Sequence, residues 1–191
     1  MIGRKYLVIL LLATFGFLCA LSYRALYPRI IDYRQYRLIS RFAEKGDSGY
    51  QRLLGEYFYD KGDFESALVW NLRAAEGGDA IAQDFMGIYF STGINEHLKP
   101  AAPDYAKARE WHEKAAAQGD PGSQTELCEW YQTGLGIPAD QEAAYFWCAL
   151  SDDSRVSEFK NLSRNALDPE ARSRVESRVA AYIDSHGKNH W

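Results

Sequence analysis

The chain repeats itself three times, and this internal repetition limits the fold more than any other feature of the sequence. Each copy begins with Gly-Asp, carries glutamine five residues after that glycine, and has Gly or Cys at nine residues and an aromatic residue at twelve. In a second block, an aspartate is followed by alanine four residues later and by tryptophan seven residues later. The first blocks start at Gly46, Gly78 and Gly119, and the second blocks at Asp63, Asp104 and Asp140. Only the length between the two blocks varies, so insertions fall in one loop.

A period of about 30–45 residues with apolar positions three or four apart is typical of an α-solenoid, in which neighbouring helical hairpins bury each other's faces. We therefore predict an all-α, right-handed solenoid over residues 46–153, with three helix-turn-helix repeats at 46–77, 78–118 and 119–153. The aspartates of the second block are expected to cap the second helices. Gly55 and Gly87 are expected to let the second helix approach, at its alanines Ala67 and Ala108.

At these residues the chain resembles the Sel-one-like repeat family, a relative of the tetratricopeptide repeats. The third copy has the most typical pattern, with the segments QTELC, GLGIP and DQEAAYFW. The resemblance extends over about residues 43–152. It implies a TPR-like solenoid whose first helices line a concave, protein-binding side.

After Asp153 the repeat pattern ends, and residues 154–191 are predicted to form capping helices and a tail. Helices are expected over 156–166 and 169–185, because Asp168-Pro169-Glu170 combines a capping side chain, an N-terminal proline and a carboxylate at the positive end of the helix dipole. The apolar stripe of the second helix, expected to cover the open end of the solenoid, consists of Ala171, Val175, Val179 and Tyr182.

Residues 6–23 form an uncharged run of 18 residues preceded by Arg4 and Lys5, which is long enough to cross a membrane as a helix. We interpret residues 1–23 as a single-pass anchor in a bacterial inner membrane, with a cleaved signal peptide as the alternative. The arginines after the run favour a cytoplasmic body by the positive-inside rule. The short basic leader before it is typical of export, and we therefore expect a periplasmic body.

Residues 24–45 carry six basic and two acidic residues and are predicted to form a basic amphipathic stalk helix. Its apolar positions are Ile31, Leu38 and Phe42, with arginines on another side. Two interpretations remain open. The helix lies against anionic lipid headgroups, or it docks on the first repeat.

Residues 46–191 contain 14 basic and 24 acidic residues. Nucleic-acid binding needs clustered Lys and Arg, so an acidic body argues against a nucleic-acid partner.

No phosphate loop, nucleophile elbow or metal-binding motif occurs in the sequence, and we expect no enzyme, no cofactor, no metal and no small-molecule substrate. His97 and His112 have no metal-ligating partner three or four residues away, so we interpret both as surface residues. The tryptophans share one position in the repeat, so we interpret them as core side chains between helices. They are Trp70, Trp111 and Trp147.

Cys128 and Cys148 fall on the two helices of the third hairpin. Either a disulfide in an oxidising compartment or a pair of buried thiols fits this placement.

Next to the buried face of each first helix lies a stripe of residues spaced by four and then three. We predict that this stripe binds a protein partner. Its members are Arg52, Glu56, Tyr59, Asp84, Ile88, Ser91, Thr125, Glu129 and Gln132.

Together these features predict a non-enzymatic protein-interaction module that is held in the inner membrane by residues 6–23. The resemblance implies one concrete role, that of an immunity protein that binds and neutralises a lipase or phospholipase effector of type VI secretion. The alternative is an envelope scaffold or adaptor in assembly or signalling. A more remote alternative is a hydrolase of the cysteine-rich repeat type, but those proteins pair cysteines in every repeat and this chain does so at most once.

Overall fold

The computed structural model describes residues 32–93 and 102–186, and within these ranges the chain is all-helical. Residues 32–43 form a first helix, called the N-terminal helix below. The other elements are α2 (Ser48–Asp60), α3 (Phe64–Glu76), α4 (Ala80–Thr92), α5 (Tyr105–Ala116), α6 (Pro121–Thr133), α7 (Gln141–Leu150), a 3₁₀ turn (Ser154–Val156), α8 (Ser157–Ala166) and α9 (Pro169–His186).

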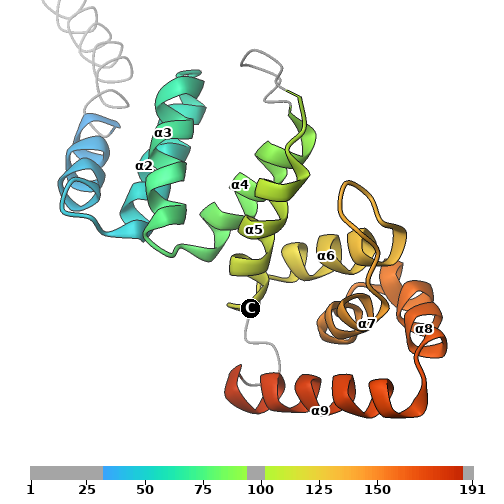
Figure 1. The fold of residues 1–191 in the computed structure, drawn as a ribbon. Helices are drawn as coiled ribbons and strands as arrows, with labels where there is room; N and C mark the ends of the chain where they lie inside the picture. Colours follow the sequence, from blue (N-terminus) through green and yellow to red (C-terminus); the bar gives the residue numbers. More distant parts are fainter. Residues whose placement is uncertain (1–31, 94–101, 187–191) are drawn as a thin grey trace, which may run out of the picture.

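Three antiparallel hairpins follow one another along the chain: α2 with α3, α4 with α5, and α6 with α7 (Figure 1). The second helix of each hairpin packs on the first helix of the next, α3 on α4 and α5 on α6. Each hairpin therefore covers the apolar face of its neighbour, as expected for a solenoid.

Aspartate caps define the start of all six repeat helices. Asp63, Asp104 and Asp140 accept hydrogen bonds from the first backbone amides of α3, α5 and α7, as predicted. The aspartates of the Gly-Asp pairs do the same for α2, α4 and α6. Each cap of this kind stabilises a helix by about 1 kcal/mol. The glycine of each pair has φ between 90° and 98°, a backbone conformation that glycine adopts most readily.

The repeated glutamine joins successive hairpins. The side-chain amides of Gln51, Gln83 and Gln124 donate to the carbonyl oxygens of Ala43, Ala75 and Ala116, each eight residues earlier. Ala75 and Ala116 lie at the ends of second helices, and Ala43 holds the same place in the N-terminal helix. The N-terminal helix therefore acts as the second helix of a preceding hairpin.

The N-terminal helix docks on the first repeat. Ile39 and Ala43 are buried against Leu54, and Tyr36 packs beside them. The predicted apolar stripe was wrong at Leu38, which is 55% exposed. The buried stripe lies one residue further along, because the glutamine contact at Ala43 sets the rotation of the helix on α2.

The two helices of each hairpin meet at one position, which we call the contact slot. A Cβ atom on Gly55 would lie 2.6 Å from Asn71 Nδ2, and one on Gly87 would lie 2.5 Å from the His112 ring. In the third hairpin the slot holds a disulfide between Cys128 and Cys148. We predicted that Gly55 and Gly87 pack against Ala67 and Ala108. Their actual partners lie one helical turn further along the second helices, at Asn71 and His112.

The tryptophans pack in the core clusters, as predicted, but each keeps part of its surface exposed. Trp70 lies against the cluster around Leu54, and Trp111 against that around Met86. Arg73 and Lys114 stack over these two rings, with cation-to-centroid distances of 4.6 and 4.1 Å. A Lys or Arg stem thus covers apolar surface that the helices leave open.

The C-terminal helices α8 and α9 both pack on α7. Ala171 and Val175 of α9 are buried, and Asp168 caps its first turn. At the other end of α9, the Tyr182 hydroxyl donates to the carbonyl oxygen of Ala116 at the end of α5. Helix α9 therefore spans from the third hairpin back to the second, as its course in Figure 1 shows.

The predicted anchor at residues 6–23 and the beginning of the stalk lie outside the described residues. Among the described helices, none has the length and apolar character needed to span a membrane.

Candidate protein-binding surface

A groove of about 220 Å³ lies between the first and second hairpins. Helix α2 supplies part of its wall through three residues of the predicted stripe, Arg52, Glu56 and Tyr59, while Asn71 reaches it from α3. Helix α4 supplies Ile81, which is 56% exposed, and Phe85. The groove thus has an apolar side from α4 and a polar side from α2.

The charges around this groove sum to a negative value. The Arg52 guanidinium lies 3.2 Å from the Asp79 carboxylate and also pairs with Glu56 one turn along α2. Asp60 at the end of α2 adds a further carboxylate. The carboxylates therefore outnumber the Arg52 cation, and the rim of the groove attracts a positively charged group of a partner.

Aromatic rings fix the shape of the groove. The Tyr59 ring meets the Phe64 ring edge-on, with centroids 5.2 Å apart. Phe85 packs against the cluster formed by Ala74, Ala75, Ala82 and Met86. Rings held by such contacts offer a preformed surface at low entropic cost for an apolar side chain of a partner.

In the second hairpin, only part of the predicted stripe is open to solvent. Ile88 is 47% exposed, and the Ser91 hydroxyl bonds to its carbonyl oxygen. Asp84, in contrast, accepts a hydrogen bond from the Ser123 hydroxyl at 2.6 Å and lies 3.2 Å from His112 Nδ1. Burial acts to raise the pKa of Asp84, but the bonds from His112 and Ser123 outweigh it and leave that pKa below its ordinary value.

His112 is fully buried, and the prediction of a surface histidine was wrong. Its ring lies over Gly87, edge-on to Trp130, with Nδ1 at 3.0 Å from the Ser123 hydroxyl. Nε2 has no hydrogen-bond partner among the described atoms. A signal exists in the sequence: His112 stands eight residues after the capping Asp104, as Asn71 and Cys148 do after theirs.

Serine, histidine and aspartate meet here without the geometry of a hydrolase. In a catalytic triad the serine and the aspartate contact different ring nitrogens. Here Ser123 and Asp84 both contact Nδ1, and the side chains of Ser123 and His112 are completely buried. The cluster therefore joins α4, α5 and α6 as a structural network.

The third hairpin also departs from the predicted stripe. Thr125 is only 3% exposed and its hydroxyl lies 2.9 Å from that of Ser151, so it does not belong to an open surface. Glu129 and Gln132 remain partly exposed. Burial, followed by the neighbouring Glu126 carboxylate, raises the pKa of Glu129.

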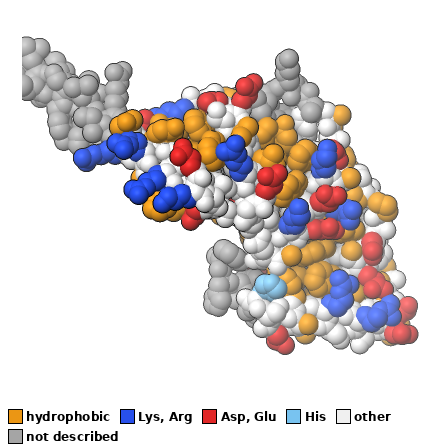
Figure 2. All heavy atoms as spheres, turned by 60° about the vertical axis from the view of Figure 1, so that its left-hand side comes forward, with side chains coloured by type: hydrophobic (Ala, Val, Ile, Leu, Met, Phe, Trp, Pro, Cys, Tyr) orange, Lys and Arg blue, Asp and Glu red, His pale blue; other side chains and the backbone are white. Residues whose placement is uncertain are grey.

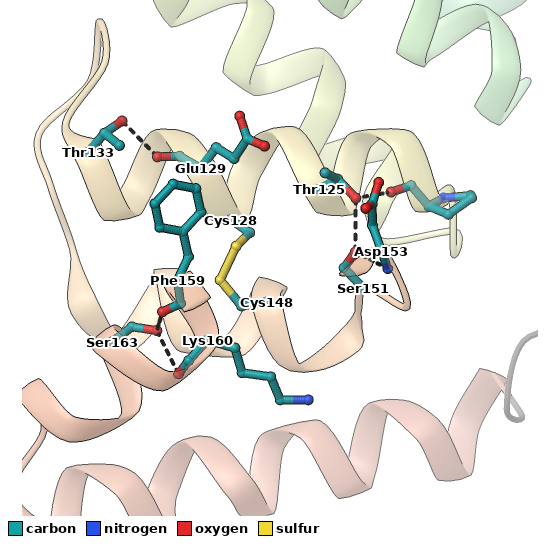
Figure 3. Close-up of a disulfide and its surroundings, with 11 residues drawn as sticks. Thr125, Cys128, Glu129, Thr133, Cys148, Ser151, Asp153, Phe159, Lys160 and Ser163 are labelled. Carbon is teal, nitrogen blue, oxygen red and sulfur yellow. Dashed lines mark hydrogen bonds between the residues drawn. A yellow bond between two sulfur atoms is a disulfide. The ribbon is translucent and has the colours of Figure 1, made fainter. Parts of the chain in front are cut away.

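The Cys128–Cys148 disulfide is buried beneath the 3₁₀ turn and α8 (Figure 3). Val156 and Phe159 pack against it, and Figure 3 shows the Phe159 ring beside the sulfur atoms. Among the described residues, this is the only contact slot that is closed covalently. Stable disulfides are typical of oxidising compartments, so the bond indicates a body outside the cytoplasm.

Four groove residues were missed from the sequence: Asp60, Asn71, Ile81 and Phe85. A signal for Ile81 exists, because the other two copies have glycine at this position, Gly49 and Gly122. An isoleucine in place of glycine near the start of α4 adds an exposed apolar side chain that the other first helices lack.

The Sel1 repeat family model matches residues 49–79, 80–120 and 121–151, which together make up more than half of the chain. The chain therefore belongs to the Sel1 repeat family, whose hairpin scaffold is usually non-catalytic and typically mediates protein–protein interactions. No curated protein matches the sequence.

Two solved structures share the fold. One is a protective antigen present in uropathogenic Escherichia coli strains that displays an SLR fold, 27% identical, with a TM-score of 0.60 over 79% of this chain and 33% of the antigen. The chain thus spans about a third of that antigen's length. The other is a Sel1 repeat protein from Oxalobacter formigenes, 24% identical, with a TM-score of 0.55 over 75% of this chain and 98% of that protein.

Proposed function

We propose that this protein is a non-enzymatic binding module whose groove between α2 and α4 receives an apolar side chain of a protein partner. The observation that carries the proposal is the exposed Ile81 beside Phe85, facing a rim on which carboxylates outnumber the cation Arg52. Such a groove suits a segment with an aliphatic or aromatic side chain next to Lys or Arg. In the third hairpin, Glu129 and Gln132 are the stripe members that stay partly exposed, and we propose them as further contacts.

We further propose that the body lies in the periplasm and that residues 6–23 anchor it in the inner membrane. Two features support this arrangement. The uncharged run is long enough to cross a bilayer, and the disulfide of the third hairpin suits an oxidising compartment.

Two roles fit such a module. In an immunity role, the acidic body binds one secreted lipase or phospholipase effector and blocks it, and opposite charge speeds their encounter. In an adaptor role, the same groove holds envelope proteins near the membrane. The roles differ in the number of partners and in whether binding abolishes an enzymatic activity.

Site-specific photo-crosslinking tests the proposal. A photoreactive phenylalanine analogue replaces Ile81 in the full chain, in cells of its own host. Val69 is the matched control, because it is also apolar and half-exposed but lies on α3, away from the groove. We expect a crosslinked partner from position 81 and none from position 69.

The identity of the crosslinked protein separates the two roles. A single secreted enzyme that loses activity when bound supports immunity, and several envelope proteins support an adaptor. Equal crosslinking from positions 69 and 81, or none from either, contradicts the groove as the binding site.

A further inference from the structure

The outward face of the N-terminal helix is basic. With 3.6 residues per turn, Arg34, Leu38 and Arg41 lie along one face, with Arg37 beside them and Lys45 in the turn that follows the helix. All of these side chains are exposed, and Leu38 is 55% exposed in the middle of the cations. Next to them, the half-exposed Tyr33 ring lies under the Arg37 guanidinium, with 5.9 Å from cation to centroid.

The docking of this helix separates its charges. Its carboxylate Asp32 is turned toward α2, where it pairs with Lys61 at 2.9 Å and accepts a hydrogen bond from the Tyr57 hydroxyl. The arginines, in contrast, are exposed to solvent. Within the described residues, no carboxylate forms an ion pair with Arg34, Arg37 or Arg41.

Two arginines of the C-terminal helices, in contrast, have compensated charge. Arg174 of α9 pairs with Glu142 at 2.8 Å and with Glu170 at 3.5 Å, and Arg164 pairs with Glu176. Figure 2 shows the same contrast: cationic side chains gather at the end of the molecule next to the grey N-terminal residues, while both signs mix over the remaining surface in view. The basic face is therefore a local feature of an otherwise acidic body.

We propose that this basic face docks on an anionic lipid bilayer, with Leu38 and Tyr33 entering the headgroup region and the arginines contacting lipid phosphates. The inference rests on the proposed anchor. Only eight residues separate the uncharged run 6–23 from Asp32, and they span at most roughly 30 Å. A bilayer that holds the run is thus within reach of the helix, and a basic helix with apolar side chains is attracted to anionic lipid.

The consequence is a fixed orientation of the solenoid. The N-terminal helix is packed on α2 through Ile39 and Ala43, so its contact with lipid places the first hairpin next to the membrane. The groove between α2 and α4 is lined by α2, α3 and α4, with no residue of the basic helix in its wall.

The test uses the full chain in vesicles and a nitroxide label at residue 38. Cys19→Ala removes the only other cysteine outside the disulfide, and Leu38→Cys carries the label. The vesicles contain either phosphatidylcholine alone or phosphatidylcholine with phosphatidylglycerol. The measured quantity is the collision rate of the label with oxygen, which dissolves in lipid, relative to a water-soluble nickel complex.

We expect this ratio to rise several-fold in phosphatidylglycerol vesicles and to return to the phosphatidylcholine value at high salt. The triple variant Arg34→Gln/Arg37→Gln/Arg41→Gln should lose the rise. The control triple variant Arg164→Gln/Arg174→Gln/Arg178→Gln removes the same charge from α8 and α9 and should keep it. A label at Val69→Cys should stay in water throughout.

Two results overturn the docking inference but leave the proposed anchor intact. In the first, the protein floats with the vesicles but the label at residue 38 stays in water. The other is lipid contact that is equal in both lipids and in both triple variants. Protein that fails to float with the vesicles instead removes the proposed anchor, and the docking inference falls with it.

Discussion

In the second hairpin, the contact slot holds the His112 ring over Gly87; in the third, the same slot holds the disulfide between Cys128 and Cys148. The second hairpin extends its slot outward through Ser123 and Asp84, which belong to α6 and α4. The third closes its slot within the hairpin and adds Val156 and Phe159 as an apolar cover. One slot therefore links neighbouring hairpins, and the other locks a single hairpin.

The difference shows what the repeat architecture requires at this position. Helix pairs must approach closely, and either the absence of a side chain on the first helix or a short covalent bond satisfies that need. A buried polar ring needs partners, and it obtains them from the next hairpin. Four changes test this comparison, in order of decreasing expected effect.

Removal of the disulfide should have the largest effect. The bond joins two residues that are 20 apart in the sequence, and a cross-link of this kind lowers the entropy of the unfolded chain. We expect Cys128→Ala/Cys148→Ala to lose about 3 kcal/mol of unfolding free energy, measured by denaturant unfolding of the detergent-solubilised protein. Cys19→Ala is the control. Equal stability of the double variant and its parent would show that packing alone holds the third hairpin.

Filling the slot of the second hairpin comes next. In Gly87→Ala the new methyl group would lie 2.5 Å from the His112 ring, which is buried on all sides and cannot withdraw. Overpacking of this kind should cost about 2 kcal/mol in a thermal melt. Gly49→Ala in α2 is the matched control, because its nearest contact is at 3.5 Å and alanine favours the helix. Similar melts for both variants would argue against the close approach at Gly87.

The disulfide should also be transferable to the first hairpin. Gly55 faces Asn71 in the equivalent slot, so Gly55→Cys/Asn71→Cys is expected to oxidise spontaneously and to gain about 1–2 kcal/mol over its reduced form. The control pair Gly55→Cys/Ala67→Cys uses the partner that the sequence suggested and should remain reduced. Thiol counting by mass spectrometry distinguishes them. Oxidation of the control pair alone would reverse the assignment of the slot.

The network of the second hairpin should respond to pH. The pKa of Asp84 in the folded protein lies below its ordinary value, so its charge stabilises the fold above about pH 4, and this contribution is lost as the pH falls through the lowered pKa. Asp84→Asn should cost about 1 kcal/mol at neutral pH and less in acid. Asp184→Asn, an exposed control in α9, should show no such trend. A pH-independent difference for Asp84→Asn would place its effect in packing, not charge.

The repeats and caps could be predicted from the sequence because their causes are local. Asp63 needs only the backbone amides of its own helix, and the glutamine at Gln83 recurs at a fixed distance from its acceptor. Contacts between helices were predicted less well. The partner of Gly87 was placed one turn too early, because the register of a hairpin depends on a loop whose length varies.

The candidate surface shows the same limit. Helical spacing placed Asp84 and Thr125 on the predicted stripe, but the next elements cover them: Ser123 reaches Asp84, and Ser151 covers Thr125. Ile81 was missed for a different reason. It stands where the other two copies have glycine, and a search for features shared by all three copies passes over such a residue.

The most direct test of the central claim is the dissociation constant of the partner captured at Ile81, measured for a variant with the groove charges reversed. Glu56→Lys/Asp60→Lys makes the rim positive without touching the contact slots. Glu110→Lys, on the exposed side of α5, is the control. We predict at least about tenfold weaker binding for the groove variant, equivalent to about 1.4 kcal/mol, and unchanged binding for the control. Equal affinity for all three proteins would contradict the claim that the partner binds between α2 and α4.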